Sequence, residues 1–121
     1  MLFNISNHPL SEWPAEQLTE AKRLWGGVED IPFPQVDPDA TAEQVNQLAE
    51  QLCEQYVQIV ERAQAGSAFH IMGELNFTFS IVTLLKQRGC RVYASTSHRQ
   101  SVVVGEGKML KSFCFHQFRE Y

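Results

Sequence analysis

The stretch AFHIMGELNFTF, from Ala68 to Phe79, decides the fold of this protein. Its first five residues are mostly apolar and predict a short buried strand, and the apolar residues after Gly73 recur at helical spacing. A strand that passes through glycine into a helix is typical of ligand sites in α/β proteins, because the first N–H groups of the helix are unpaired. Glu74 and Asn76 are therefore expected at the rim of such a site, although a plain strand–helix connection gives the same pattern.

The rest of the chain up to Ala94 alternates between strand and helix patterns. Pro32 and Pro34 confine one strand to a sheet edge or a strand end, and Gln44 is placed to complete a capping box with Thr41. The further expected elements are a strand at 2–5, a helix that starts near Ser11 and stops at Gly26, a weak strand at 28–33, a helix from Thr41 to Gly66, a helix closed by Gly89, and a strand at 90–94.

The C-terminal part departs from this alternation. Residues 95–99 are expected to form a loop, and residues 101–118 a β-hairpin that turns at Gly105-Glu106-Gly107. Strict alternation in its second strand predicts one face with Phe113 and Phe115, and another with Cys114, His116 and Phe118.

We predict one α/β domain over residues 1–121, with a mostly parallel sheet, helices on both faces and a C-terminal hairpin. Ligands of such sheets bind beyond the carboxyl ends of the strands, where the strand order reverses. Three polar strand ends are therefore expected to converge on one pocket. They are Ser6-Asn7-His8, Gly73-Glu74-Asn76 and Thr96-Ser97-His98-Arg99.

The composition is that of a soluble globular protein, with 44% hydrophobic and 20% charged residues. No apolar run approaches the roughly 20 residues of a membrane helix, and the N-terminus has no signal-peptide pattern. The three widely spaced cysteines predict buried thiols in a reducing compartment, and hence a cytoplasmic protein.

The net charge of −4 is unevenly distributed. Residues 1–85 carry a net charge of −9, whereas residues 86–121 carry +5. This asymmetry favours an anionic partner, or pairing of the two parts with each other or across a dimer.

Several side chains at these strand ends suit acid–base or phosphate chemistry. His8 and His98 are expected to face one pocket as hydrogen-bond donors or as acid and base, and Arg99 suits the forked hydrogen bonds that phosphate accepts. Exposed loop histidines and a generic polar loop are the alternatives. Glu74 suits a general base, a ribose acceptor or a helix N-terminal acid, and His70 reads as structural. No nucleotide-binding or metal-binding motif is present, so no metal or cofactor is expected.

Four segments together resemble the small CRISPR-associated proteins of the CARF-like, ring-nuclease-type group. They are LFNISNHPLSEW (2–13), HIMGELNFTFSIVTLLKQRG (70–89), VYASTS (92–97) and FHQFREY (115–121). The resemblance implies a Rossmann-like homodimer that binds a cyclic oligoadenylate, with cyclic tetra-adenylate expected, and no long nucleic acid. Cleavage in this group is typically metal-independent and uses a ribose 2′-hydroxyl as the nucleophile.

Residue by residue, the resemblance assigns catalysis to His8, His98 and Arg99. It assigns ligand binding to Ser6, Asn7, Gly73, Glu74, Asn76, Thr96 and Ser97. The chain has no lysine at the three strand ends, which some related pockets use at the scissile phosphate, so a sponge that binds the ring without cleaving it is the alternative. A nucleoside-processing enzyme with Glu74 as nucleophile and a purely structural dimerisation domain are further alternatives.

Overall fold

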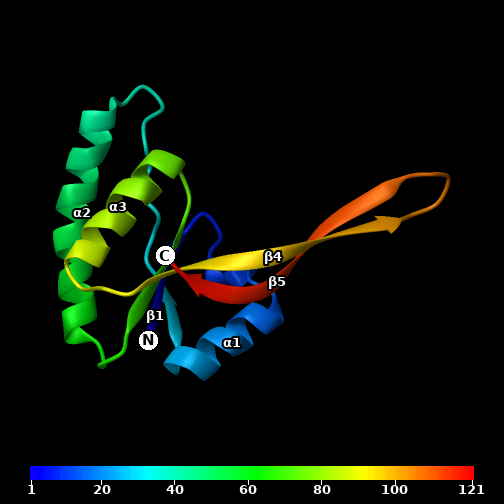
Figure 1. The fold of residues 1–121 in the computed structure, drawn as a ribbon, viewed down its shortest axis with the longest axis horizontal. Helices are drawn as coiled ribbons and strands as arrows, with labels where there is room; N and C mark the ends of the chain where they lie inside the picture. Colours follow the sequence, from blue (N-terminus) through cyan, green and yellow to red (C-terminus); the bar gives the residue numbers. More distant parts are fainter.

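The protein is an α/β fold built on one five-stranded sheet, as its computed structural model shows (Figure 1). The structure describes the backbone of residues 1–121 and all side chains except those of Gln100, Val102 and residues 109–113. Its elements are β1 (Leu2–Ser6), η1 (Leu10–Glu12), α1 (Ala15–Trp25), β2 (Val28–Asp30), α2 (Ala42–Arg62), β3 (Ala68–Met72), α3 (Leu75–Gln87), β4 (Val92–Val103) and β5 (Met109–Glu120).

The strand order is β2-β1-β3-β4-β5, so the chain reverses direction across the sheet between β1 and β3. The first four strands pair in parallel, and β5 pairs antiparallel to β4. The predicted fold class is therefore confirmed, including the C-terminal hairpin. The neighbours β1 and β3 define the switch point at which ligands of such sheets bind.

Residues of β1 and β3 alternate between two different environments. Phe3, Ile5, Phe69 and Ile71 belong to the main apolar core with α2 and α3, which pack together on one side of the sheet (Figure 1). Leu2 and Ala68 instead pack with α1 in a second, smaller cluster. Because side chains alternate between the two faces of a strand, one face of β1 and β3 lies in the main apolar core and the other face lies towards α1.

The helix α2 follows the sequence prediction closely. The Thr41 hydroxyl accepts from Gln44 N, and the Gln44 side chain accepts from Thr41 N, which completes the capping box. Its apolar face includes Val45, Ala49 and Cys53. Within the part of the chain that the structure describes, no helix combines the length and apolar character needed to cross a bilayer.

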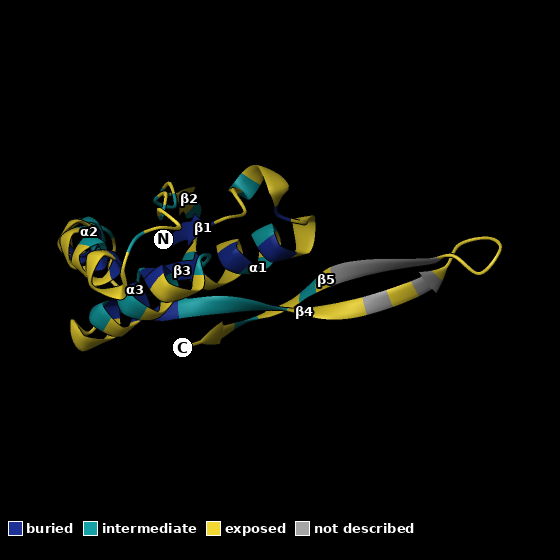
Figure 2. Ribbon diagram, turned by 90° about the horizontal axis from the view of Figure 1, so that it is seen from above, coloured by how far each residue is buried: buried dark blue, intermediate teal, exposed yellow. Residues whose placement is uncertain are grey.

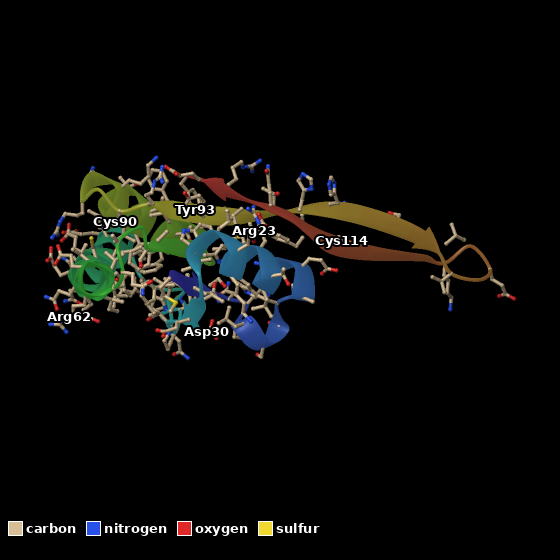
Figure 3. The ribbon with its side chains drawn as sticks, turned by 90° about the horizontal axis from the view of Figure 1, so that it is seen from below. Arg23, Asp30, Arg62, Cys90, Tyr93 and Cys114 are labelled. Atoms are coloured by element: carbon tan, nitrogen blue, oxygen red, sulfur yellow. The ribbon has the colours of Figure 1, made fainter. Side chains whose placement is uncertain are left out.

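Two predicted segments differ from the structure. Residues 95–99 form no loop, because β5 pairs with them and β4 continues without a break to Val103. The weak strand predicted at 28–33 stops at Asp30, before the two prolines that cannot donate to a ladder. The prediction of three buried cysteines is confirmed for Cys53 and wrong for the other two, because Cys90 is half-buried and Cys114 is exposed on the hairpin (Figure 3).

The outer part of the β4–β5 hairpin projects from the body as an arm, defined here as residues 98–114 (Figures 1 and 2). A β-bulge lies at its base, because Thr96 pairs with Gln117 whereas Ser97 pairs with Phe115. The bulge leaves His116 unpaired and brings the Phe115 and Phe118 rings to a centroid distance of 5.0 Å. The prediction that these two rings lie on opposite faces is therefore wrong; the Phe113 side chain lies outside the described residues.

Candidate functional site

A cavity of about 350 Å³ lies at the carboxyl ends of β1 and β3, on the side of the sheet that α1 covers. Its lining residues come from the end of β1 (Ser6, His8), the η1–α1 segment (Glu12, Trp13, Pro14, Gln17), β3 (His70, Met72), β4 (Ser95, Thr96, Ser97) and β5 (Phe115). Larger hollows surround Gly27 and Gly66, near the amino ends of β1 and β3. Only the first of these cavities lies where parallel sheets bind their ligands.

A chain of hydrogen bonds runs under this cavity from Asp30 to Ser95. The Asn4 amide nitrogen donates to Asp30 Oδ1 at 2.8 Å and to the His8 carbonyl at 2.9 Å. Asn4 therefore turns its oxygen, an acceptor, towards His70 Nδ1 at 2.8 Å. His70 Nδ1 must carry the hydrogen, so Nε2 accepts from the Ser95 hydroxyl at 3.2 Å. The Asp30 carboxylate thus fixes the tautomer of His70 indirectly, because it orients the Asn4 amide that contacts the imidazole.

His70 is held in its neutral form. Its side chain is 2% exposed, and burial is the main reason that its pKa falls to about 4; the nearby His8 lowers it further. The ring also packs edge-on against Trp13 and Phe118. A neutral imidazole with a fixed tautomer positions the Ser95 hydroxyl without bringing charge to the cavity floor.

His8 contributes to the site through both its backbone and its side chain. Its carbonyl accepts from Asn4 Nδ2, the Ser6 hydroxyl and Trp13 Nε1, which fixes the turn after β1. Its exposed imidazole lies with Nδ1 3.5 Å from a Glu12 carboxylate oxygen. A rigid backbone thus presents an accessible imidazole, oriented by a carboxylate, at the cavity wall.

Among the sequence-predicted site residues, the structure gathers Ser6, His8, Thr96 and Ser97 around the cavity. Asn7 is exposed beside them, and its N–H donates to the Met72 carbonyl. The end of β1 and the middle of β4 therefore meet at the cavity, and β3 joins them through residues that precede Gly73.

The segment that follows β3 caps α3 and packs on the α2–α3 side of the sheet, away from the cavity. Both Glu74 carboxylate oxygens accept backbone hydrogen bonds, from Asn76 N and Phe77 N, so this residue caps α3. A Cβ added to Gly73 would lie 2.4 Å from the Phe33 ring, so this glycine permits close packing. Gly73, Glu74 and Asn76 do not line the cavity. Their position gives no support to a Glu74 nucleophile.

His98 and Arg99 lie further out, on the arm. His98 Nε2 is 2.9 Å from His116 Nδ1, and both side chains are exposed. Within the described residues, no three metal-ligating side chains cluster, so none of them gives this pair a third ligand. Neither residue lines the cavity of its own chain.

Sequence reasoning missed several lining residues, chiefly Glu12, Trp13, Gln17, His70, Met72, Ser95 and Phe115. One signal for them was available. Along the α1 side of the two central strands, the sequence changes from apolar to polar, from Leu2 to Asn4 and Ser6 and from Ala68 to His70. Buried polar side chains at neighbouring strand ends mark the place where a sheet meets a polar cavity.

Fold and cavity together define an α/β protein with a ligand-type pocket at a parallel-sheet switch point. The chain belongs to the Uncharacterized protein MJ1673 family, whose family model matches residues 1–119. Neither the curated proteins nor the solved structures gave a match.

Proposed function

We propose that this protein binds a cyclic oligoadenylate, with cyclic tetra-adenylate as the expected ring, and cleaves it without a metal ion. In this proposal a cytoplasmic homodimer ends the antiviral signal of a type III CRISPR system. The supporting observation is the cavity at the switch point, where the polar end of β1 meets polar residues in the middle of β4. The first turn of α1 borders this cavity at Pro14, and the positive end of a helix favours phosphate.

The reaction requires alignment and proton transfer. A ribose 2′-oxygen attacks the adjacent phosphorus, the bond from phosphorus to the 5′-oxygen breaks, and a 2′,3′-cyclic phosphate and a 5′-hydroxyl result. His8 takes the proton of the 2′-hydroxyl or gives one to the leaving oxygen, with Glu12 orienting its ring. Ser6, Thr96 and Ser97 supply hydrogen bonds to ribose and phosphate oxygens.

Size and charge both favour a dimer. A cavity of about 350 Å³ is at the low end of the roughly 300–1,000 Å³ typical of small-molecule pockets, so one chain holds part of a ring. Among the side chains that the structure describes, no lysine or arginine lines it. The arm carries Arg99 and Lys108 beyond the body, and a second copy's arm supplies the missing positive charge to a symmetric ligand.

The decisive experiment incubates radiolabelled cyclic tetra-adenylate with excess protein in EDTA. Wild type should yield linear products, and His8→Ala should lower the rate about 100-fold, the range expected for a lost acid or base. Gln51→Met, on the exposed side of α2, is the control and should cleave normally. Full activity in His8→Ala would remove His8 from catalysis, and absence of any binding would end the proposal.

The described lining of the cavity includes no lysine or arginine, which favours a second candidate, a sponge that sequesters the ring. In the same assay a sponge retains intact radiolabelled ring in complex with the protein. Light scattering with and without the ring then tests the dimer, which both candidates require.

A further inference from the structure

The side chain of Gln17 is a buried polar group without an internal role. It lines the cavity, it is 7% exposed, and it has no hydrogen-bond partner within the part of the chain that the structure describes. Its amide atoms are not sealed from solvent, unlike the Thr78 hydroxyl, which is buried without a partner among the described residues. The amide therefore faces the cavity with its donor and its acceptor open to a ligand.

A comparison of two helices excludes the usual structural role of a glutamine at this position. Gln44 is the third residue of α2, and its side chain accepts from the backbone N–H of the N-cap, Thr41. Gln17 is likewise the third residue of α1, but its N-cap is Pro14, which has no N–H. The capping bond that occupies Gln44 cannot form at Gln17, so the amide remains available to the cavity.

The chemistry of a carboxamide restricts what this group can recognise. It presents one acceptor oxygen beside one donor nitrogen, which matches the amino group and ring nitrogen N7 of adenine. The corresponding edge of guanine or hypoxanthine presents two acceptors, which leaves the amide oxygen facing another oxygen. Trp13 and Phe115 line the same cavity and offer aromatic surface to a base.

We propose that Gln17 is the residue that selects adenine, by pairing its amide with the N6–N7 edge of one base of the ligand. This inference rests on the proposed function for the ring, but the recognition itself concerns a single base. It assigns α1 to base selection, whereas the end of β1 and the middle of β4 act on ribose and phosphate.

The test compares affinities for two pairs of probes by isothermal titration. One pair is cyclic tetra-adenylate and cyclic tetra-inosinate, and the other is adenosine and inosine 5′-monophosphate. Wild type should prefer the adenine member of each pair by about tenfold or more, as expected for a bidentate amide contact. Gln17→Met keeps the size of the side chain and should bring the preference close to one. Gln51→Met, the same change at an exposed site, should keep the wild-type preference.

The outcomes separate this inference from the proposed function. If Gln17→Met binds the adenylate ring with undiminished preference, Gln17 does not select the base, although the ring remains the ligand. If the rings do not bind but the monophosphates show a preference that depends on Gln17, adenine selection stands and the cyclic ligand is wrong. If no probe binds to folded wild type, both fall. Circular dichroism of each variant establishes that it is folded.

Discussion

The two faces of the central strands β1 and β3 differ in chemistry although they alternate along the same ten residues. On the α2–α3 side, Phe3, Ile5, Phe69 and Ile71 are 5% exposed or less and pack within the main apolar core. On the α1 side, the equally buried Asn4 and His70 bond to each other. One face therefore stabilises the fold through the burial of apolar surface. The other face fixes the polar side chains at the floor of the cavity.

The difference shows how a small domain can combine stability with a site. A fold that is stabilised by apolar burial on one face of the sheet can bury polar groups on the other face, provided that each polar group has a hydrogen-bond partner. Asn4 satisfies Asp30, His8 and His70 at once, so the polar face is as ordered as the apolar one. The following predictions test this division of roles.

Phe69→Ala should have the largest effect. The side chain is fully buried in the apolar face, and its loss should lower the free energy of unfolding by about 3–5 kcal/mol. Urea denaturation measures this value. Phe79→Ala is the matched control, because that ring is 76% exposed, and it should change stability by no more than about 0.5 kcal/mol.

The polar face should make stability depend on pH. The pKa of His70 is about 4 in the folded protein against an ordinary 6.5, so the unfolded chain binds the proton first as the pH falls. Its contribution should be complete above pH 6.5 and should be lost towards pH 4, with a total of about 3 kcal/mol. Urea denaturation of wild type and His70→Gln across this range isolates the effect. An equal pH dependence in both proteins would contradict it.

Asn4→Ala should cost about 1–3 kcal/mol, because it leaves the buried His70 N–H without its acceptor. A double-mutant cycle with His70→Ala should show that much of this cost disappears when both partners are absent. Gln47→Ala removes an amide from an exposed position and serves as the control. Additive effects in the cycle would show that the two side chains do not act as a pair.

Glu74→Ala should lower stability by about 1 kcal/mol through the loss of the α3 cap. It should leave the affinity for the ring unchanged, because Glu74 does not line the cavity. Calorimetric melting and titration measure the two quantities separately. Glu74→Asp, which can still cap, should restore most of the stability; a loss of affinity without a loss of stability would instead place Glu74 in the site.

Val103→Ser, on the arm, should have the smallest effect. The side chain is 70% exposed, so neither apolar packing nor polar satisfaction depends on it, and the change should stay within about 0.5 kcal/mol. Urea denaturation tests this, and a loss above 1 kcal/mol would show that the arm has a buried face in solution.

The sequence was sufficient to predict the alternation of elements and the Thr41 capping box, and it placed Ser6, His8, Thr96 and Ser97 near one another. These follow from local rules of spacing and capping. The sequence also allowed two roles for Glu74, and the structure assigns it to the cap because both oxygens point back to the α3 backbone.

The remaining site residues depend on tertiary placement, which local spacing does not encode. Gln17 follows the pattern of a helix surface and becomes buried only because α1 packs beside β5. His70 has the spacing of a core residue, and only its register with Asn4 and its contact with Ser95 place it at the cavity floor. The continuation of β4 through residues 95–99 depends equally on a partner strand.

The bulge at the base of the arm makes the cavity wall sensitive to the length of β5. Because one extra residue, His116, interrupts the pairing, Phe115 takes the place beside Ser97 that the next residue would otherwise hold. A deletion of His116 would restore regular pairing and keep Phe115 opposite Ser97, whereas a deletion of Phe115 would bring His116 opposite Ser97 and exchange the aromatic ring for an imidazole at the wall. An insertion of one residue near the hairpin tip would lengthen the arm and leave the cavity wall intact. An insertion at the bulge would instead change which residue of β5 lies at the wall. Natural variation in length should therefore collect at the tip and avoid the base.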